Sequence, residues 1–257
     1  MPPTNSGRSK TGATRRATPT RPDHAEAPLD DRVRDTIAWL EARGTKKSRE
    51  AMGRYGITAS KAFGVSVSDL RELSKRLGRD HALAAALWES GWYEARMLTA
   101  FVDDPLLVTA SQMDRRAREF DNWAICDALC FHLFDRSAHA WRKIEQWSDH
   151  KAEFVKRAAF ALLASVALHD KQAPDAPFLR AIPLVERAAT DDRNFVRKGV
   201  SWALRSLGER NRTLHAAALA SAERMAASAD PSVRWVGKDA RRGLTSAATR
   251  KRIAARR

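Results

Sequence analysis

Apolar residues recur along most of the chain with the period of an α-helix. Residues 154–168 carry an apolar side chain at about every third or fourth position, and leucine recurs at helical spacing in residues 68–73, which begin with the capping residue Ser68. Asp104 followed by Pro105 is a capping residue with proline at the first helical position, and it predicts another helix start. Alternating strand patterns between hairpin turns are missing, so the chain is predicted to be all-α.

The helical pattern repeats at intervals of about 40 residues. The sequence FVKR at residues 154–157 is matched 41 positions later by FVRK at 195–198, and a related copy, DPSVR, occupies 230–234. This spacing of turn residue, valine, basic residue and small-apolar helix is typical of HEAT-like repeats. Each unit is a helix pair that cannot bury its apolar face alone, so we expect a helical-repeat solenoid. Residues 30–150 show similar helix lengths without a clean repeat, which indicates earlier, degenerate units.

The charge of the chain indicates an acidic partner. Its 257 residues include 46 Lys and Arg against 31 Asp and Glu, a formal net charge of +15, which favours nucleic acid. Equivalent basic positions of the repeats would line up along a concave face and match a phosphate backbone. The alternative is structural, with each cation bonded to an aspartate of the neighbouring repeat. The candidate DNA-binding residues are Lys156, Arg157, Arg197, Lys198 and Arg234.

Composition divides the chain into three parts. Residues 1–27 contain four prolines among small and basic residues. They cannot bury enough apolar surface to offset the entropy of ordering, so we expect a disordered basic arm. Residues 28–245 form the predicted repeat domain, and residues 246–257 form a basic C-terminal tail that can continue as a helix. We expect the protein to be a monomer.

Three features bear on location. No apolar run approaches the ~18–20 residues that span a bilayer, and the N-terminus lacks the hydrophobic stretch of a secretory signal. Cys126 and Cys130 cannot build a disulfide framework, so they are interpreted as reduced thiols. We therefore expect a cytoplasmic protein without a membrane partner.

Other chemistry finds little support in the sequence. Cys126, Cys130 and His132 lie on one predicted helix without a second ligand pair, so no metal site is expected. No glycine-rich phosphate loop is present, which argues against nucleotide hydrolysis, and no cofactor is expected. His169 ends a predicted helix and is assigned no role. Four tryptophans are expected to pack between repeats: Trp88, Trp92, Trp141 and Trp147.

The segment around Asp127 is the strongest candidate for chemistry. Trp123 and Asp127 are four residues apart, so they share one face of a helix. Asp127 lies in an otherwise apolar run, where a carboxylate is costly unless it faces a cleft or finds a partner. Two interpretations stay open: a cleft carboxylate, or a buried one paired with an arginine of the next repeat. Trp202, in a later helix, is either a core residue or part of the same cleft.

These segments together resemble a known family. Residues 121–127, 154–159 and 195–205 are similar to the three signature segments of the HEAT-like-repeat DNA alkylation-repair glycosylases of the AlkD type. Residues 54–56 and 63–65 also resemble the N-terminal part of that family, and the similarity covers about residues 30–245. The resemblance implies excision of positively charged alkylated purines, such as 7-methylguanine and 3-methyladenine, from double-stranded DNA. It further implies a monofunctional DNA glycosylase that leaves the lesion stacked and does not cleave the strand.

The resemblance also implies roles for particular residues. Asp127, Trp123 and Trp202 would form the cleft around the lesion nucleotide, and Arg157 would contact DNA. The family has two successive arginines where this chain has Lys156 and Arg157, so bidentate contacts can pass only to Arg157. Asp127 would stabilise the cationic, oxocarbenium-like sugar of the transition state.

Two other functions were weighed against excision. One is a non-catalytic HEAT-repeat nucleic-acid-binding protein in which Asp127 is structural. The other, a protein-binding scaffold, is disfavoured by the positive charge. The set of Trp123, Asp127 and Trp202 favours the enzyme, because a pure binder has no reason to keep it.

Overall fold

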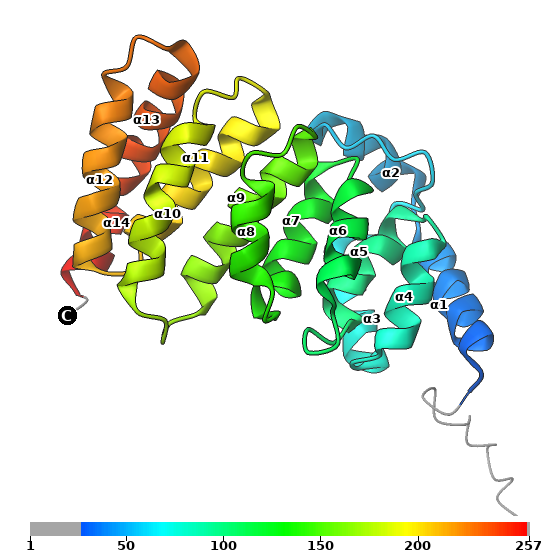
Figure 1. Ribbon diagram of the computed structural model, residues 1–257. Helices are drawn as coiled ribbons and strands as arrows, with labels where there is room; N and C mark the ends of the chain where they lie inside the picture. The colour runs from blue at the N-terminus through cyan, green and yellow to red at the C-terminus, as the bar shows by residue number, and fades with distance from the viewer. Residues whose placement is uncertain (1–26, 256–257) are drawn as a thin grey trace, which may run out of the picture.

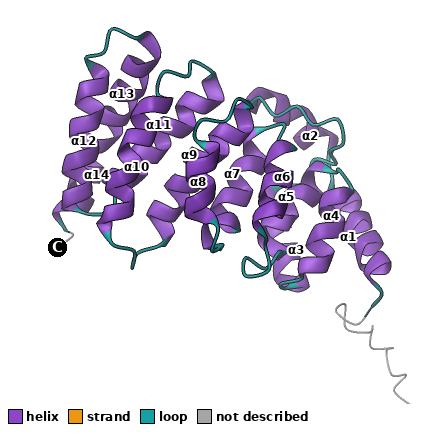
Figure 2. Ribbon diagram, viewed as in Figure 1, coloured by secondary structure: helices purple, strands orange, loops and turns teal. Residues whose placement is uncertain are grey.

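The computed structural model describes residues 27–255, and every regular element in that range is helical, which confirms the all-α prediction (Figures 1 and 2). The predicted arm of residues 1–27 lies, apart from Ala27, outside the described residues. In chain order the helices are α1 (Leu29–Arg43), α2 (Lys46–Met52), η1 (Gly53–Tyr55), α3 (Val67–Leu77), α4 (His81–Glu89), α5 (Tyr93–Val102), α6 (Ala110–Arg118), α7 (Trp123–His132), η2 (Phe134–Arg136), α8 (Ala140–Trp147), α9 (Glu153–His169), α10 (Asp175–Ala188), α11 (Asn194–Gly208), α12 (Arg212–Ala226), α13 (Pro231–Leu244) and α14 (Ala247–Ala254).

The helices stack side by side in a curved row from α1 to α13 (Figure 1). One layer contains α3, α5, α7, α9, α11 and α13, and each of these helices packs against the next one in the series. The other layer contains α4, α6, α8, α10 and α12, whose members contact one another less. Helices on the inside of a curve lie closer together, so the first series forms the inner layer. The arrangement is the predicted solenoid of helix pairs.

Capping residues determine where several helices begin. Ser66 caps α3 by accepting a hydrogen bond from the Asp69 amide, so the helix begins earlier than the predicted cap at Ser68. The predicted helix start at Asp104 is wrong. The Asp104 carboxylate accepts from the Leu106 amide in a turn only, and α6 begins after a second cap, Thr109. The leucines that would continue a helix from Asp104 are exposed, so no packing would stabilise one there.

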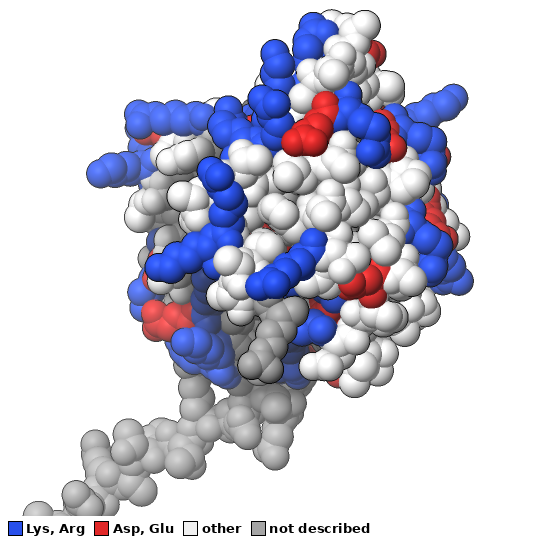
Figure 3. Space-filling model, turned by 90° about the vertical axis from the view of Figure 1, so that its left-hand side faces the viewer, with Lys and Arg blue, Asp and Glu red and all other residues white. Residues whose placement is uncertain are grey.

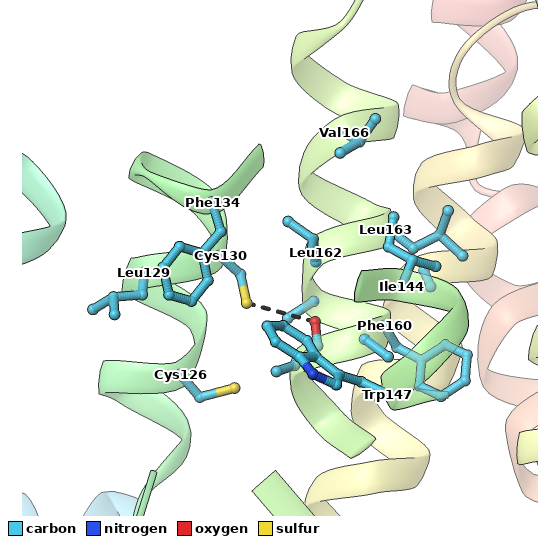
Figure 4. Packing of buried hydrophobic residues seen from close by; sticks show 14 of the residues in the cluster. Cys126, Leu129, Cys130, Phe134, Ile144, Trp147, Phe160, Leu162, Leu163 and Val166 are labelled. Carbon is cyan, nitrogen blue, oxygen red and sulfur yellow. Dashed lines mark hydrogen bonds between the residues drawn. The ribbon is translucent and has the colours of Figure 1, made fainter. Parts of the chain in front are cut away.

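Helix α9 lies at the centre of the core. Most of its residues are buried, and many of them are alanines, which allow the neighbouring helices to approach closely. Cys126 and Cys130 of α7 are buried against it (Figure 4). Their thiols donate to the carbonyl oxygens of Phe154 and Ala158, respectively. The predicted packing of the tryptophans is confirmed: Trp88 and Trp147 are buried, and Trp92 and Trp141 pack half-buried against the core.

The C-terminal residues pack onto the last repeat. Helix α14 buries Ile253 against the solenoid, and Arg252 forms an ion pair with Glu209. Part of the predicted basic tail of residues 246–257 is therefore a docked helix. Among residues 27–255, no helix is both long and apolar enough to cross a membrane.

Candidate active site and nucleic-acid interface

Helix α7 places two of the predicted catalytic residues, Trp123 and Asp127, on the inner layer. Asn122 caps the helix by accepting from the amides of Ala124 and Ile125 at 3.0 and 3.1 Å. The helix therefore begins at Trp123, and Asp127 follows one turn later on the same face. Both side chains are partly buried and partly exposed at the surface of the inner layer.

Asp127 is held by an arginine of the next repeat. Arg157 of α9 donates through Nε to Oδ1 at 2.9 Å and through Nη2 to Oδ2 at 2.7 Å. Its third nitrogen, Nη1, donates to the Phe195 carbonyl oxygen of α11 at 2.6 Å. The structure thus shows the ion pair of the second interpretation of Asp127. The pair is not completely covered, since the side chain of Asp127 is 20% exposed and that of Arg157 is 8% exposed.

Burial and pairing act in opposite directions on this carboxyl. Burial raises the pKa of Asp127, and the charge and hydrogen bonds of Arg157 lower it in part. A guanidinium that donates two parallel hydrogen bonds fits an ionised carboxylate and fixes its orientation. The orientation of the pair is therefore fixed, and Asp127 is its more exposed partner.

The two indoles lie on the same layer, partly open to solvent. Trp123 donates from Nε1 to the Tyr55 carbonyl oxygen at 2.8 Å, which fixes its ring. Trp202 of α11 is half-buried and stacks with Phe131 of α7, the ring centroids being 6.5 Å apart. Trp202 therefore packs against the core with one part of its ring and keeps another part exposed.

Tyr55 is a site residue that sequence analysis missed. It belongs to residues 53–56, here called the N-terminal strap, which reach from α2 to the inner layer. Its side chain is 68% exposed beside Trp123. Gly56 ends the strap at φ +68° and faces the Phe195 ring, which lies 3.2 Å from where a Cβ would stand. In the sequence this segment stands out only through the family resemblance. The contact between Tyr55 and Trp123 joins residues that are 68 positions apart and leaves no local pattern.

The predicted basic positions differ in their partners. Lys156 forms an ion pair with Asp191 at 3.1 Å, and the Arg197 guanidinium lies 4.6 Å from the centroid of the Trp235 ring. Arg234 donates to the backbone carbonyls of Ser228 and Ala229, in the loop between α12 and α13. Lys198 is exposed and forms no ion pair with any residue from 27 to 255. The five candidate DNA-binding residues are therefore partly engaged within the protein, and Lys198 is the one among them that is exposed and makes no such contact with residues 27–255.

Further cations gather at the C-terminal end of the solenoid. Figure 3 views this end, where Lys and Arg side chains project around the face and acidic side chains are fewer. The exposed cations of α13 and α14 include Lys238, Arg241, Arg242, Arg250 and Lys251. They extend the positive surface beyond the equivalent positions of the repeats.

Comparisons with known proteins give the family and the fold of the chain. The sequence model of the family described as "DNA alkylation repair enzyme" matches residues 36–242. No curated protein matches the chain. A solved structure from a family "related to the HEAT-like repeat DNA glycosylases with affinity for branched DNA structures" superposes with a TM-score of 0.71 at 16% identity, covering 88% of this chain and 97% of the other. A designed armadillo repeat protein in complex with a peptide gives a TM-score of 0.36 at 14% identity, covering 73% and 79%.

The resemblance inferred from the sequence is thereby confirmed, and the superposition shows the shared HEAT-like fold. Since the family match spans most of the chain, the protein belongs to the DNA alkylation repair enzymes.

Proposed function

We propose that the protein is a monofunctional DNA glycosylase that excises positively charged alkylated purines, 7-methylguanine and 3-methyladenine, from duplex DNA. The observation that carries the proposal is the partly exposed Asp127 side chain, fixed by two hydrogen bonds from Arg157 on the inner layer. Trp123 shares its helix face, and Trp202 is half-exposed on the same layer. These are the residues to which the family resemblance assigns the lesion cleft.

The reaction needs charge stabilisation more than acid catalysis. Alkylation places a positive charge on the purine, so the base takes the electrons of the C1′–N bond and leaves neutral. The sugar then carries the positive charge until water adds at C1′ and loses a proton. A carboxylate about 4 Å from that charge, at an effective dielectric near 20, stabilises it by about 4 kcal/mol, or roughly a thousandfold in rate.

Arg157 reduces this effect without cancelling it. Its guanidinium is the less exposed partner, so we expect a sugar on the inner layer to approach the pair from the side of Asp127. The faces of Trp123 and Trp202 add cation–π attraction of about 0.5–2 kcal/mol for a charged nucleotide. Both groups favour a cationic substrate over an undamaged, neutral base.

Phosphate contacts would position the duplex. Lys198 is exposed and could bind a phosphate without giving up a partner in the protein. Arg197 and Arg234 add positive charge on neighbouring repeats. Lys156 would have to exchange its partner Asp191 for DNA. In this proposal Arg157 contributes to DNA contact mainly by holding Asp127 and the Phe195 carbonyl in place.

The test is release of free base from methylated DNA. We expect Asp127→Asn to lower release of 7-methylguanine and 3-methyladenine by about a hundredfold or more, while DNA affinity stays close to that of the wild type. Asp239→Asn is the matched control, because Asp239 is also 20% exposed and also pairs with an arginine, Arg205 at 2.6 Å. Equal activity of Asp127→Asn would remove Asp127 from the mechanism.

One observation favours a second candidate function. Both oxygens of Asp127 are engaged by Arg157, and the superposed relative is described by its affinity for branched DNA. The protein would then be a non-catalytic DNA-binding protein in which the pair is structural. Tight DNA binding by the wild type, with no release of either methylated base, would select this function over excision.

A further inference from the structure

A row of contacting aromatic rings crosses the inner layer on the C-terminal halves of its helices. Phe101 of α5 lies 4.7 Å from His132, which lies 5.0 Å from Phe131, both of α7. Phe131 in turn lies 4.3 Å from His169 of α9 and stacks with Trp202 of α11. We call these five residues the aromatic row.

The row is only half-buried, and it is held in place from behind. Each of its five side chains keeps part of its surface exposed. His169 is fixed by a hydrogen bond between Nδ1 and the fully buried Asp135 carboxylate. Rings held by neighbouring rings and by a buried carboxylate need little reordering to meet a flat partner.

Two exposed arginines border the row. The Arg71 guanidinium lies 5.8 Å from the centroid of the Phe101 ring, and Arg136 donates to the His132 carbonyl oxygen at 2.6 Å. Flat π-surfaces flanked by cations match a single nucleic-acid strand, whose bases stack on rings while its phosphates pair with arginines. The bases of an intact duplex are already stacked on each other and offer no free faces.

We propose that the aromatic row binds the unpaired bases of a DNA strand that leaves the duplex held on the inner layer. The inference rests on the DNA-binding part of the proposed function. It shares Trp202 with the excision site and adds four residues that the excision chemistry does not use: Phe101, Phe131, His132 and His169. Binding is independent of base identity, because every base has a π-face.

The charge state of His132 provides an independent readout. Burial, together with the charges of Arg71, Arg136, His169 and Arg79, lowers the pKa of His132 to about 4, so the ring is neutral at pH 7. The phosphates of a bound strand would offset those cations. A stacked base would also bury the ring further. We therefore expect the pKa of His132 to change when the overhang DNA binds and to stay the same when the blunt duplex binds, as followed by proton NMR titration.

The main experiment compares three DNAs with the full-length protein by fluorescence anisotropy. They are a blunt duplex, the same duplex with a four-thymidine overhang, and the same duplex with an overhang of four abasic nucleotides. The abasic overhang keeps the phosphates and removes the stacking surfaces. We expect the thymidine overhang to bind about tenfold or more tighter than the abasic one.

Variants locate the effect. Phe131→Leu and His132→Leu should abolish the difference between thymidine and abasic overhangs and leave blunt-duplex affinity within about twofold. Trp141→Leu is the control, because it removes a half-buried ring that packs on Phe178 of the outer layer. It should leave the difference intact.

Equal affinity of the wild type for the two overhangs would overturn the proposal, and this comparison requires no variant to fold. A base-dependent difference that survives in both row variants would overturn it as well. Failure of excision is a separate outcome: Asp127→Asn should lose base release and keep the overhang preference.

Discussion

At the scale of single residues, the ion pair of Asp127 and Arg157 bears on both the proposed reaction and the stability of the fold. The pair connects α7 to α9, and Arg157 reaches on to the Phe195 carbonyl of α11. The spacing of Trp123 and Asp127 on one face followed from the sequence, as did an arginine of the next repeat as an alternative partner. The sequence could not predict which partner is more exposed, because exposure depends on the packing of three helices.

The stability of Asp127 variants tests the structural side of the pair. Asp127→Asn leaves a buried guanidinium without a charged partner and replaces one of its acceptor oxygens by an NH2 donor, so we expect the free energy of unfolding to fall by about 3 kcal/mol in denaturant titration. The double variant Asp127→Asn with Arg157→Met removes the unpaired charge and should recover part of that loss. A double variant less stable than the single one would contradict this account.

The pH dependence of stability should contain a contribution from Asp191. Hydrogen bonds from Arg193, and also from Lys156, lower the pKa of Asp191 to about 2, and its side chain is 9% exposed. A carboxyl with a lowered folded-state pKa stabilises the fold above its unfolded pKa, near 4, and loses that contribution as the pH falls through about 2. This contribution is about 2 kcal/mol at pH 7.

Asp191→Asn should therefore cost about 2 kcal/mol of unfolding free energy at pH 7 and much less near pH 2. Denaturant midpoints of the two proteins at both pH values measure this difference. A gap that stays constant with pH would show that the aspartate acts by packing and not by charge.

At the scale of helices, periodicity predicts which segments are helical, and packing determines where they begin. Residues 154–168 were predicted as a helix and lie within α9. The false start at Asp104 shows the limit of a local signal: the cap geometry forms, and the helix does not, because Leu106 and Leu107 find no core. The contacts of the N-terminal strap could not be predicted, because its partners Trp123 and Phe195 are distant in the sequence and give no local signal.

Close packing between α12 and α13 gives a prediction at this scale. A Cβ on Gly237 would stand 2.2 Å from the Ala226 backbone nitrogen, so Gly237→Ala must push the two helices apart. We expect a loss of about 3 kcal/mol in unfolding free energy. Gly53→Ala is the control, because a Cβ there meets nothing within 4 Å; it should change stability by less than about 1 kcal/mol.

At the scale of the whole molecule, the net charge of +15 governs association with DNA. The repeat architecture, the family and the positive charge were all accessible from the sequence, because each is a property of composition or period. The engagement of Lys156 and Arg157 by aspartates was not fixed by spacing, since the same spacing allows both a phosphate and a carboxylate partner.

Removal of residues 1–27 tests the role of the basic arm. The segment carries five Lys and Arg against two Asp and Glu, so its deletion should lower DNA affinity and make the dependence of log K on log salt less steep. The excision rate on bound DNA should be unchanged. A truncated protein that binds equally well at every salt concentration would exclude the arm from DNA binding.

The N-terminal strap has a mechanical consequence. In a solenoid whose repeats contact only their neighbours, small movements between repeats can stretch or bend the whole stack. Here the Tyr55 carbonyl oxygen accepts a hydrogen bond from Trp123 of α7, and Gly56 lies beside the Phe195 ring of α11, so the N-terminal strap contacts repeats that are not its neighbours in the sequence. These contacts should limit how far α7 and α11 move apart when DNA binds.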